Sequence, residues 1–331
     1  DGCAGEEYFI DSEGISFFDV RDVLFINIVV DHPFYYHKFL PYLPKKYIQI
    51  SIDREHEAYL ERFFPEMRRG PFMPLGGTSL WENGKFPGYD DRKYDIVFTG
   101  NYNPPSIFHE AIHRHGDEYA EFYYDIIHDL IRHPWRSMDA VIMEHLNRDV
   151  EDIDEKGLKE TMPNMIFIDL YVRHYFRGEV VKTLVDHGFR VHCFGAGWDQ
   201  LDCRHPENII NGNVLDSLGC LQQISRSRLS LNVMPWFKDG AHDRVFNSML
   251  NGAVSLSDSS RYMDEILEDG KHFVRYDLAK LEELPEKAEQ ILSDKEKWEY
   301  LVGQGYRMAN RGHTWAHRAR FIHSEILCKI P

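Results

Sequence analysis

Residues 228–258 read RLSLNVMPWFKDGAHDRVFNSMLNGAVSLSD, and this stretch decides the fold. Apolar residues alternate with smaller or polar ones at its start, and the run stops at Pro235, which is typical of a strand. After a loop, Asp243 is a good N-cap for an amphipathic helix, and Gly252 stands where a helix-ending glycine belongs. Residues 253–258 form a second apolar run that ends on a carboxylate. The stretch therefore predicts a strand–loop–helix–strand unit of an α/β fold.

The loop before this helix predicts an anion-binding site. A glycine-containing loop that opens a helix presents free backbone N–H groups and the positive end of the helix dipole. An arginine in the first helical turn adds a fixed cation. The residues placed at this site are Asp239, Gly240, Ala241, His242, Asp243 and Arg244. The plain alternative is an ordinary βαβ unit whose loop binds nothing.

Several short motifs follow one another along the chain in a recognisable order. They are IVVDHP (28–33), PLGG (74–77), RVFNSMLNGAVSLSD (244–258), EDGK (268–271) and HTWAHR (313–318). In this order they resemble the CgeB-like (spore maturation protein type) family of GT-B glycosyltransferases. The resemblance covers most of the chain, thinly between residues 105 and 180, and it rests on the order of the motifs rather than on any one of them.

The resemblance implies a GT-B-like α/β fold with two Rossmann-like, doubly wound domains. Apolar runs at residues 23–30 and 47–52 predict buried parallel strands, and a third strand is expected at 72–75. The polar, Gly- and Pro-rich residues 81–92 predict a boundary between a domain of residues 1–92 and one of residues 93–331. The second domain is expected to carry a helical insertion at about 104–188 and a terminal helix that crosses back. Since the first clear strand comes so early after Asp1, the N-terminal domain is expected to be short or incomplete.

The resemblance also implies roles for particular residues. The helix N-terminus and Arg244 are expected to stabilise a leaving nucleoside diphosphate, so that no metal or cofactor is needed. In related retaining enzymes two acidic residues eight positions apart contact the sugar and the ribose, and here those positions hold Asp239 and Asn247. The neutral amide of Asn247 thus departs from the family pattern. Further donor-binding candidates are Gly100, Asn101, Gly195, Ile210, Asn211 and Asp258, and the candidates on the acceptor side are Asp31 and His32.

A second function class follows from His109-Glu110-Ala111-Ile112-His113, which is a literal HExxH. On a helix this motif puts two imidazoles one turn apart, as in zinc peptidases. The chain has 18 histidines, so the motif can arise by chance, and a metzincin would need a histidine where Tyr119 stands. We therefore expect that no residue of the chain serves as a metal ligand. A third class, a catalytically weak sugar- or nucleotide-binding relative, is favoured by Asn247.

The composition of the chain argues against some classes of binding partner. The chain has 331 residues and a formal net charge of −16 without a block of basic residues, which argues against nucleic acid or an anionic membrane surface. No apolar run approaches the ~20 residues that span a bilayer. Five cysteines without a CxxC pair indicate reduced thiols in a cytoplasmic protein. The expected partners are a nucleotide-sugar donor and an acceptor that is a protein, a glycan or a small molecule.

Overall fold

The computed structural model describes residues 9–150 and 152–329, and the chain divides into two compact units. The first unit combines Asp1–Pro74, Ser137–Ile166 and Phe321–Pro331, and the second combines Leu75–Arg136 and Phe167–Arg320. The division thus falls at Pro74 rather than at residue 92, and part of the predicted helical insertion belongs to the first unit.

The first unit is built on two parallel strands, β1 (Phe25–Val29) and β2 (Tyr47–Ser51). The expected third strand is an extended segment instead, held to β2 by the bond from Met73 N to Ser51 O at 3.0 Å. The core of the first unit contains Ile48, Ile50, Met73 and Ile326. The helices of this unit are α1 (Phe17–Val20), α2 (Arg54–Phe63), α5 (Met138–Asp149) and α6 (Glu155–Thr161).

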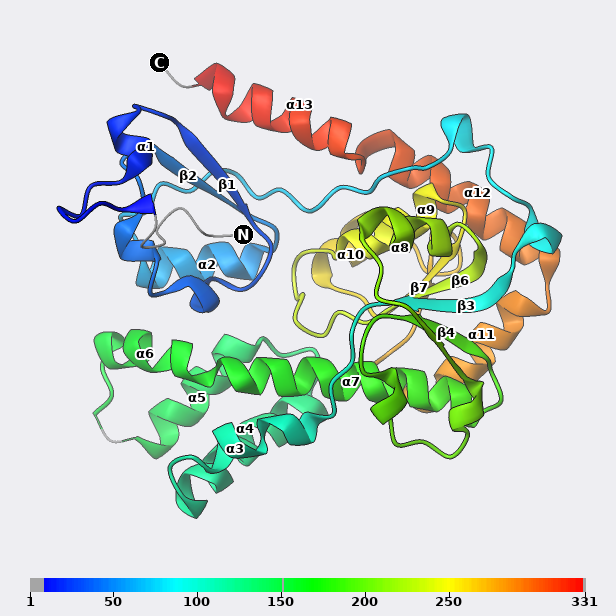
Figure 1. Ribbon diagram of the computed structural model, residues 1–331, viewed down its shortest axis with the longest axis horizontal. Helices are drawn as coiled ribbons and strands as arrows, with labels where there is room; N and C mark the ends of the chain where they lie inside the picture. Colours follow the sequence, from blue (N-terminus) through cyan, green and yellow to red (C-terminus); the bar gives the residue numbers. More distant parts are fainter. Residues whose placement is uncertain (1–8, 151, 330–331) are drawn as a thin grey trace. The chain divides into compact units, whose positions relative to one another are not determined.

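The second unit is built on a six-stranded parallel sheet in the order β5-β4-β3-β6-β7-β8 (Figure 1). Counted along this unit the order is 3-2-1-4-5-6, the doubly wound arrangement. The chain reverses its direction of travel between β3 and β6, and ligands of such sheets gather beyond the carboxyl ends of the strands at that point. The strands are β3 (Tyr94–Thr99), β4 (Val191–Phe194), β5 (Ile209–Gly212), β6 (Ser227–Asn232), β7 (Val254–Ser257) and β8 (Val274–Arg275).

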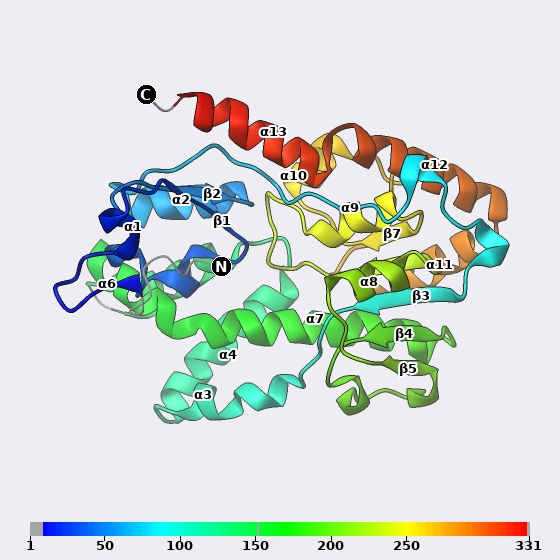
Figure 2. The same ribbon diagram turned by 45° about the horizontal axis from the view of Figure 1, so that its top comes forward.

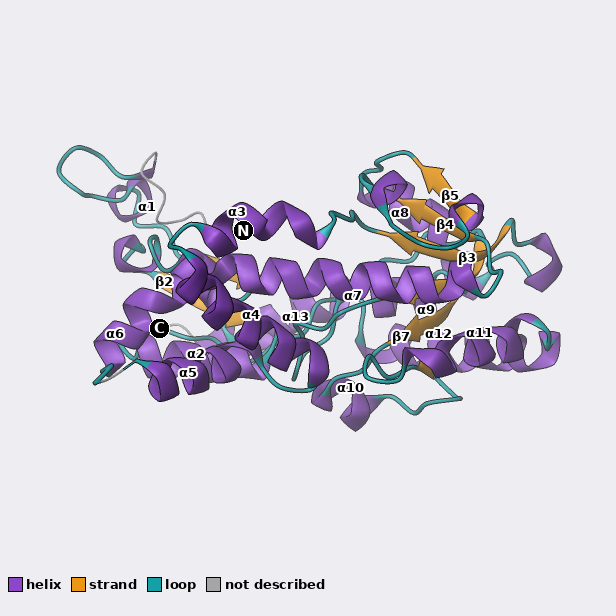
Figure 3. Ribbon diagram, turned by 90° about the horizontal axis from the view of Figure 1, so that it is seen from below, coloured by secondary structure: helices purple, strands orange, loops and turns teal. Residues whose placement is uncertain are grey.

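Helices cover both faces of this sheet. The long helix α7 (Ile166–Asp186) runs along one face, and α8 (Ser217–Ile224) and α9 (Asp243–Leu250) lie on the other (Figures 2 and 3). Val97 of β3 packs against Ile224 of α8. This arrangement follows from right-handed crossovers that run in opposite directions from β3.

The remaining helices complete the chain. Within the described part of residues 104–188 the elements are all helical, as the sequence predicts.

None of the helices among residues 9–150 and 152–329 is long and apolar enough to cross a membrane. Cys193, Cys203, Cys220 and Cys328 are free thiols, and Cys3 lies outside the described residues. The further helices are α3 (His109–His113), α4 (Asp117–Arg132), α10 (Arg261–Ile266), α11 (Leu284–Leu292), α12 (Lys295–Gly312) and α13 (Trp315–Glu325).

Candidate active site

Arg244 lies where the sheet of the second unit changes direction. Its Nη1 donates to Asn232 Oδ1 at 2.6 Å, and its Nε donates to Thr99 Oγ1 at 3.2 Å. Asn232 and Thr99 are the last residues of β6 and β3, so the guanidinium joins the carboxyl ends of the two strands that flank the switch point. The side chain is buried, and burial lowers its pKa while Asp243 acts in the opposite direction. An arginine keeps its charge at neutral pH, so the sequence-predicted cation is present at this place.

The N-terminus of α9 differs by one residue from the prediction. The N-cap is His242, whose Nδ1 accepts from Arg244 N at 3.1 Å, and Asp243 is the first helical residue. Burial and then the charge of Arg244 lower the pKa of His242, whereas Asp243, whose Oδ1 lies 2.8 Å from the same Nδ1, raises it. Although burial opposes ionisation, His242 and Arg244 lower the pKa of Asp243 to about 2. Asp243 is thus a carboxylate and offsets part of the positive charge of Arg244.

Gly100 and Gly195 bring the loops after β3 and β4 into direct contact. A Cβ on Gly195 would lie 2.3 Å from Gly100 O, and a Cβ on Gly100 would lie 3.5 Å from Arg244 Nη2. Asn101 Oδ1 accepts from Ala196 N at 2.9 Å. The predicted Gly100, Asn101 and Gly195 therefore lie together beside Arg244. Asn101 uses its side chain to hold the neighbouring loop.

A second cation at this place was missed by sequence reasoning. Arg177, on α7, donates from Nη1 to Asn101 O at 3.0 Å, and its charge also contributes to the lowered pKa of His242. Its guanidinium lies 5.2 Å from the ring centroid of Trp236 in the loop after β6. No spacing along the chain links Arg177 to Arg244, because the two come from helices on opposite faces of the sheet.

The loop that precedes α9 is tied to the segment after β7. Ser260 Oγ donates to Gly240 O at 2.5 Å, and Arg261 Nε lies 3.4 Å from Asp239 Oδ2. Asp258 is buried, and its Oδ1 accepts from Met234 N at 2.9 Å. These bonds join the predicted site residues of the two loops into one connected region, namely Asp239, Gly240, Ala241 and Asp258. Ala241 is fully buried there.

Asn247 holds a neighbouring chain segment. Its Nδ2 donates to Asp243 Oδ2 at 3.0 Å, and its Oδ1 accepts from Thr78 N at 2.8 Å. The amide makes both hydrogen bonds because it has a donor and an acceptor, whereas an ionised carboxylate has acceptors only. A structural role thus accompanies the expected contact with a ribose, which stays a prediction.

The motifs behind the resemblance meet around α9. Gly77 N donates to His313 O at 2.7 Å, and the ring of His313 stacks on Phe246 at 4.4 Å between centroids. Arg318, buried like Arg244, donates from Nη2 to Leu75 O at 3.2 Å. The PLGG segment from Leu75 onward and the HTWAHR segment therefore pack on the helix that carries Arg244.

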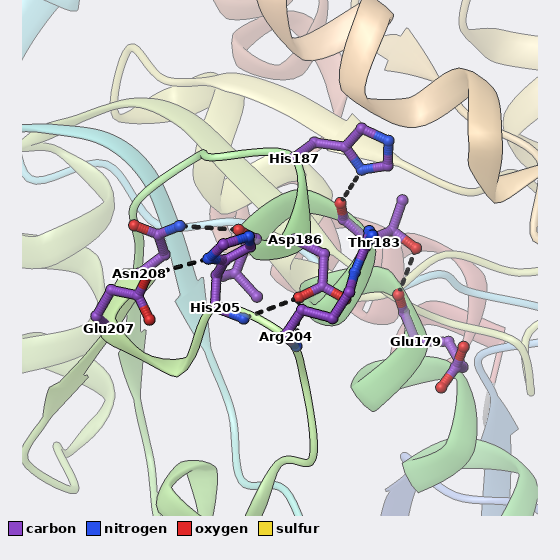
Figure 4. A network of polar contacts seen from close by, with 9 residues as sticks. Glu179, Thr183, Asp186, His187, Arg204, His205, Glu207 and Asn208 are labelled. Carbon is purple, nitrogen blue, oxygen red and sulfur yellow. Dashed lines mark hydrogen bonds and ion pairs between the residues drawn. The ribbon is translucent and has the colours of Figure 1, made fainter.

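Ile210 and Asn211 lie on β5, the edge strand of the sheet. The turn before this strand is held by Asp186, whose Oδ1 accepts from Arg204 N at 2.7 Å and from His205 N at 3.1 Å (Figure 4). Asn211 is exposed and Ile210 is half-buried. The end of α7 thus positions this strand, and contacts of Ile210 and Asn211 with the donor remain a prediction.

Asp31 and His32 belong to the first unit. His32 is buried, its Nδ1 accepts from Phe34 N at 3.3 Å, and its Nε2 lies 3.9 Å from Asp139 Oδ1. Its ring also contacts Tyr59 at 4.7 Å between centroids. His32 therefore takes part in the packing of its own unit, and a role for it or for the half-buried Asp31 toward an acceptor remains a prediction.

The HExxH histidines lie on the short helix α3. The rings of His109 and His113 are 4.6 Å apart between centroids. Within residues 9–150 and 152–329, no group of three or more His, Cys, Asp or Glu side chains that could hold a metal ion occurs.

We therefore expect purified, tag-free protein to contain no stoichiometric zinc, because two imidazoles on one helical turn leave a tetrahedral site incomplete. Elemental analysis checks this, together with melting curves recorded with and without chelator. One tightly bound zinc per chain, with a lower melting temperature in chelator, would instead support the peptidase reading.

Asp258 predicts a pH dependence of stability. Burial raises the pKa of this carboxyl to about 7, whereas an unfolded aspartate titrates near 3.9, about the value of a model peptide. Between these values the unfolded state loses the proton while the folded state keeps it, so rising pH favours unfolding through this window. Asp258→Asn removes the ionisation and keeps an acceptor for Met234 N. The variant should gain stability relative to the wild type as pH rises from about 4 to 7, by up to about 4 kcal/mol. Denaturant titrations at several pH values measure the difference, and parallel curves for the two proteins would contradict the prediction.

Comparison with known proteins agrees with this geometry. Residues 173–324 match a family model described as glycosyl transferase-like. No curated protein matches the sequence. Among solved structures, the sucrose-phosphate synthase of Thermosynechococcus elongatus superposes with a TM-score of 0.52 at 11% identity, over 96% of this chain and 72% of that one.

Two other solved structures superpose less closely. A TarM mutant of S. aureus, in complex with fondaparinux, alpha-GlcNAc-glycerol and UDP, has a TM-score of 0.47 at 9% identity over 83% of this chain and 43% of its own. The pneumococcal O-GlcNAc transferase GtfA, in complex with UDP and GlcNAc, has a TM-score of 0.43 at 10% identity over 84% and 44%. The chain thus spans less than half of each of these two proteins.

The GT-B-like α/β fold predicted from the sequence is confirmed by the shared fold of the synthase. The family match over residues 173–324 indicates an enzyme of the glycosyltransferase class. The narrower CgeB-like assignment stays a prediction.

Proposed function

We propose that the protein transfers a sugar from a nucleoside-diphosphate sugar to an acceptor, with the diphosphate bound at the switch point of the second unit. The observation that carries this proposal is the position of Arg244. Its guanidinium is fixed by Thr99 and Asn232 at the ends of β3 and β6. This is the place in a doubly wound sheet where ligands bind, and a nucleotide phosphate is the anion that suits an arginine there.

In the proposed reaction the bond between the sugar and the diphosphate breaks, and the leaving group gains negative charge. Arg244, Arg177 and the N-terminus of α9 would stabilise that charge as it develops, so the proposal needs no divalent metal. Arg177 strengthens the proposal, because Asp243 neutralises part of the charge of Arg244. Asp239 stands where related retaining enzymes have their first acidic residue, which supports retention of the anomeric configuration. The acceptor is a protein, a glycan or a small molecule.

A thermal-shift panel tests this proposal. We expect at least one of UDP, GDP and their hexose conjugates to raise the melting temperature, equally with and without EDTA, because the ligand binds only the folded state. Release of free nucleotide from the stabilising donor would then separate an enzyme from a protein that merely binds it. If no nucleotide or nucleotide sugar shifts the melting temperature at millimolar concentration, the proposal is wrong.

A further inference from the structure

An open pocket of about 180 Å³ lies beside the carboxyl ends of β7 and β8 and the loop after β6. Its walls include Asp258, Ser259 and Ser260 after β7 and Arg275 and Tyr276 at β8. The pocket therefore combines carboxyl, hydroxyl and guanidinium groups within a small volume. All of its lining residues belong to the second unit.

Trp135 forms part of the wall of this pocket from outside the sheet. It lies in the turn between α4 and α5 and is 64% exposed, although tryptophan is a large apolar residue. Exposing such a ring has no benefit for folding. At the mouth of a polar pocket, by contrast, an exposed ring offers a flat apolar surface to a ligand.

The turn that carries Trp135 is held on both sides. Asp129 Oδ1 lies 2.6 Å from His133 Nδ1, and Asp129 Oδ2 accepts from Arg136 Nη1 at 2.9 Å. On the other side, Lys238 Nζ donates to the carbonyls of Pro134 and Pro235, which ties the turn to the loop after β6. The backbone that carries the ring is therefore held in place before any ligand arrives, which reduces the entropy lost on binding.

We propose that this pocket binds a pyranose ring, with Trp135 as the platform for one face of the sugar. A pyranose has apolar C–H faces and a rim of hydroxyl groups. The C–H face fits the indole, and the hydroxyl groups fit the carboxyl, hydroxyl and guanidinium groups of the opposite walls. The choice of a saccharide rests on the proposed function, and the sugar belongs either to the donor or to the acceptor.

The pocket is connected to the proposed diphosphate site. Ser260, one of its lining residues, donates to Gly240 O in the loop that precedes α9. Arg261, which also lines the pocket, lies 3.4 Å from Asp239. A sugar in the pocket would therefore lie next to the loop at which the diphosphate is proposed to bind.

The experiment compares the wild type with Trp135→Ala, Trp135→Phe and Tyr119→Ala. Tyr119 is a matched control, since it is an exposed aromatic residue on α4 that does not line the pocket. Saturation-transfer NMR measures the binding of methyl pyranosides of glucose, galactose, mannose and N-acetylglucosamine. Calorimetry compares UDP and GDP with UDP-glucose, UDP-N-acetylglucosamine and GDP-mannose.

If the sugar is that of the acceptor, Trp135→Ala should weaken the binding of a methyl pyranoside about 5- to 10-fold. The affinity for every nucleotide ligand should stay unchanged. If it is that of the donor, Trp135→Ala should weaken a nucleotide sugar by a similar factor while the free nucleotide is unaffected. In both cases Trp135→Phe should retain most of the affinity, and Tyr119→Ala should match the wild type. Equal binding of all sugar ligands by the wild type and Trp135→Ala, or no binding of any of them, would overturn the proposal.

These outcomes are distinct from failure of the proposed function. A wild type that binds methyl pyranosides through Trp135 but no nucleotide would retain the saccharide pocket and refute the transferase. A wild type that binds a nucleotide sugar no better than the free nucleotide, and no methyl pyranoside, would retain the nucleotide site and refute the pocket.

Discussion

Arg244→Gln should lower the turnover of sugar transfer by about 10²- to 10³-fold, the usual effect of removing one group that stabilises a developing negative charge. Affinity for the free nucleotide should fall less, by roughly 1–3 kcal/mol, because that interaction is made already in the ground state. The glutamine is neutral, so the variant loses the charge that offsets the leaving diphosphate. Steady-state kinetics with the donor found in the thermal-shift panel measure both effects, since kcat and affinity separate them.

The control for this prediction is Arg318→Gln. Arg318 and Arg244 are both 7% exposed, and Arg318 binds the carbonyls of Gly312 and Leu75 rather than the switch point. The two variants should lose comparable stability. When turnover is expressed per folded molecule, only Arg244→Gln should show a loss. Equal turnover of the two folded variants would show that Arg244 serves the fold alone.

Gly195→Ala should destabilise the second unit by roughly 2–6 kcal/mol, the sum of a strained backbone and an overpacked contact. Gly195 has a φ of +154°, and the new Cβ would lie 2.3 Å from Gly100 O. Gly100 cannot yield freely, because its loop lies against Arg244. The surviving folded protein should therefore also bind nucleotide more weakly.

Gly188→Ala separates the two causes. Gly188 has a φ of +92° but nothing within 4 Å of the position of a new Cβ, so it carries the backbone strain without the contact. We expect it to lose only about 1–3 kcal/mol and to bind nucleotide like the wild type. Chemical denaturation with calorimetry compares the variants. Equal losses in both would mean that the contact between Gly195 and Gly100 is unimportant.

The sequence predicted the local elements of the second unit well, because its strands and helices alternate with clear turn signals. The strands at residues 227–232 and 254–257 and the helix at 243–250 lie where the apolar pattern of residues 228–258 places them. The N-cap lies one residue before the predicted Asp243, since His242 accepts the bond for which an aspartate is the usual choice.

Longer-range features could not be predicted, because they depend on tertiary packing. Arg244 binds Thr99 across 145 positions in the chain, and nothing in the local pattern links the two. Arg177 and Trp135 reach their sites only through the path of α7 and the turn before α5. The helices of residues 137–166 joined the first unit, which no composition change along the chain announces.

We propose that a nucleoside diphosphate binds at Arg244. Calorimetric titration of the wild type, Arg244→Gln and Arg318→Gln with UDP and GDP at low ionic strength tests it most directly. We expect the wild type and Arg318→Gln to bind at least one of the two nucleotides with the same affinity, and Arg244→Gln to bind it about 5- to 150-fold more weakly. Binding of neither nucleotide by the wild type, or equal binding by all three proteins, would contradict it.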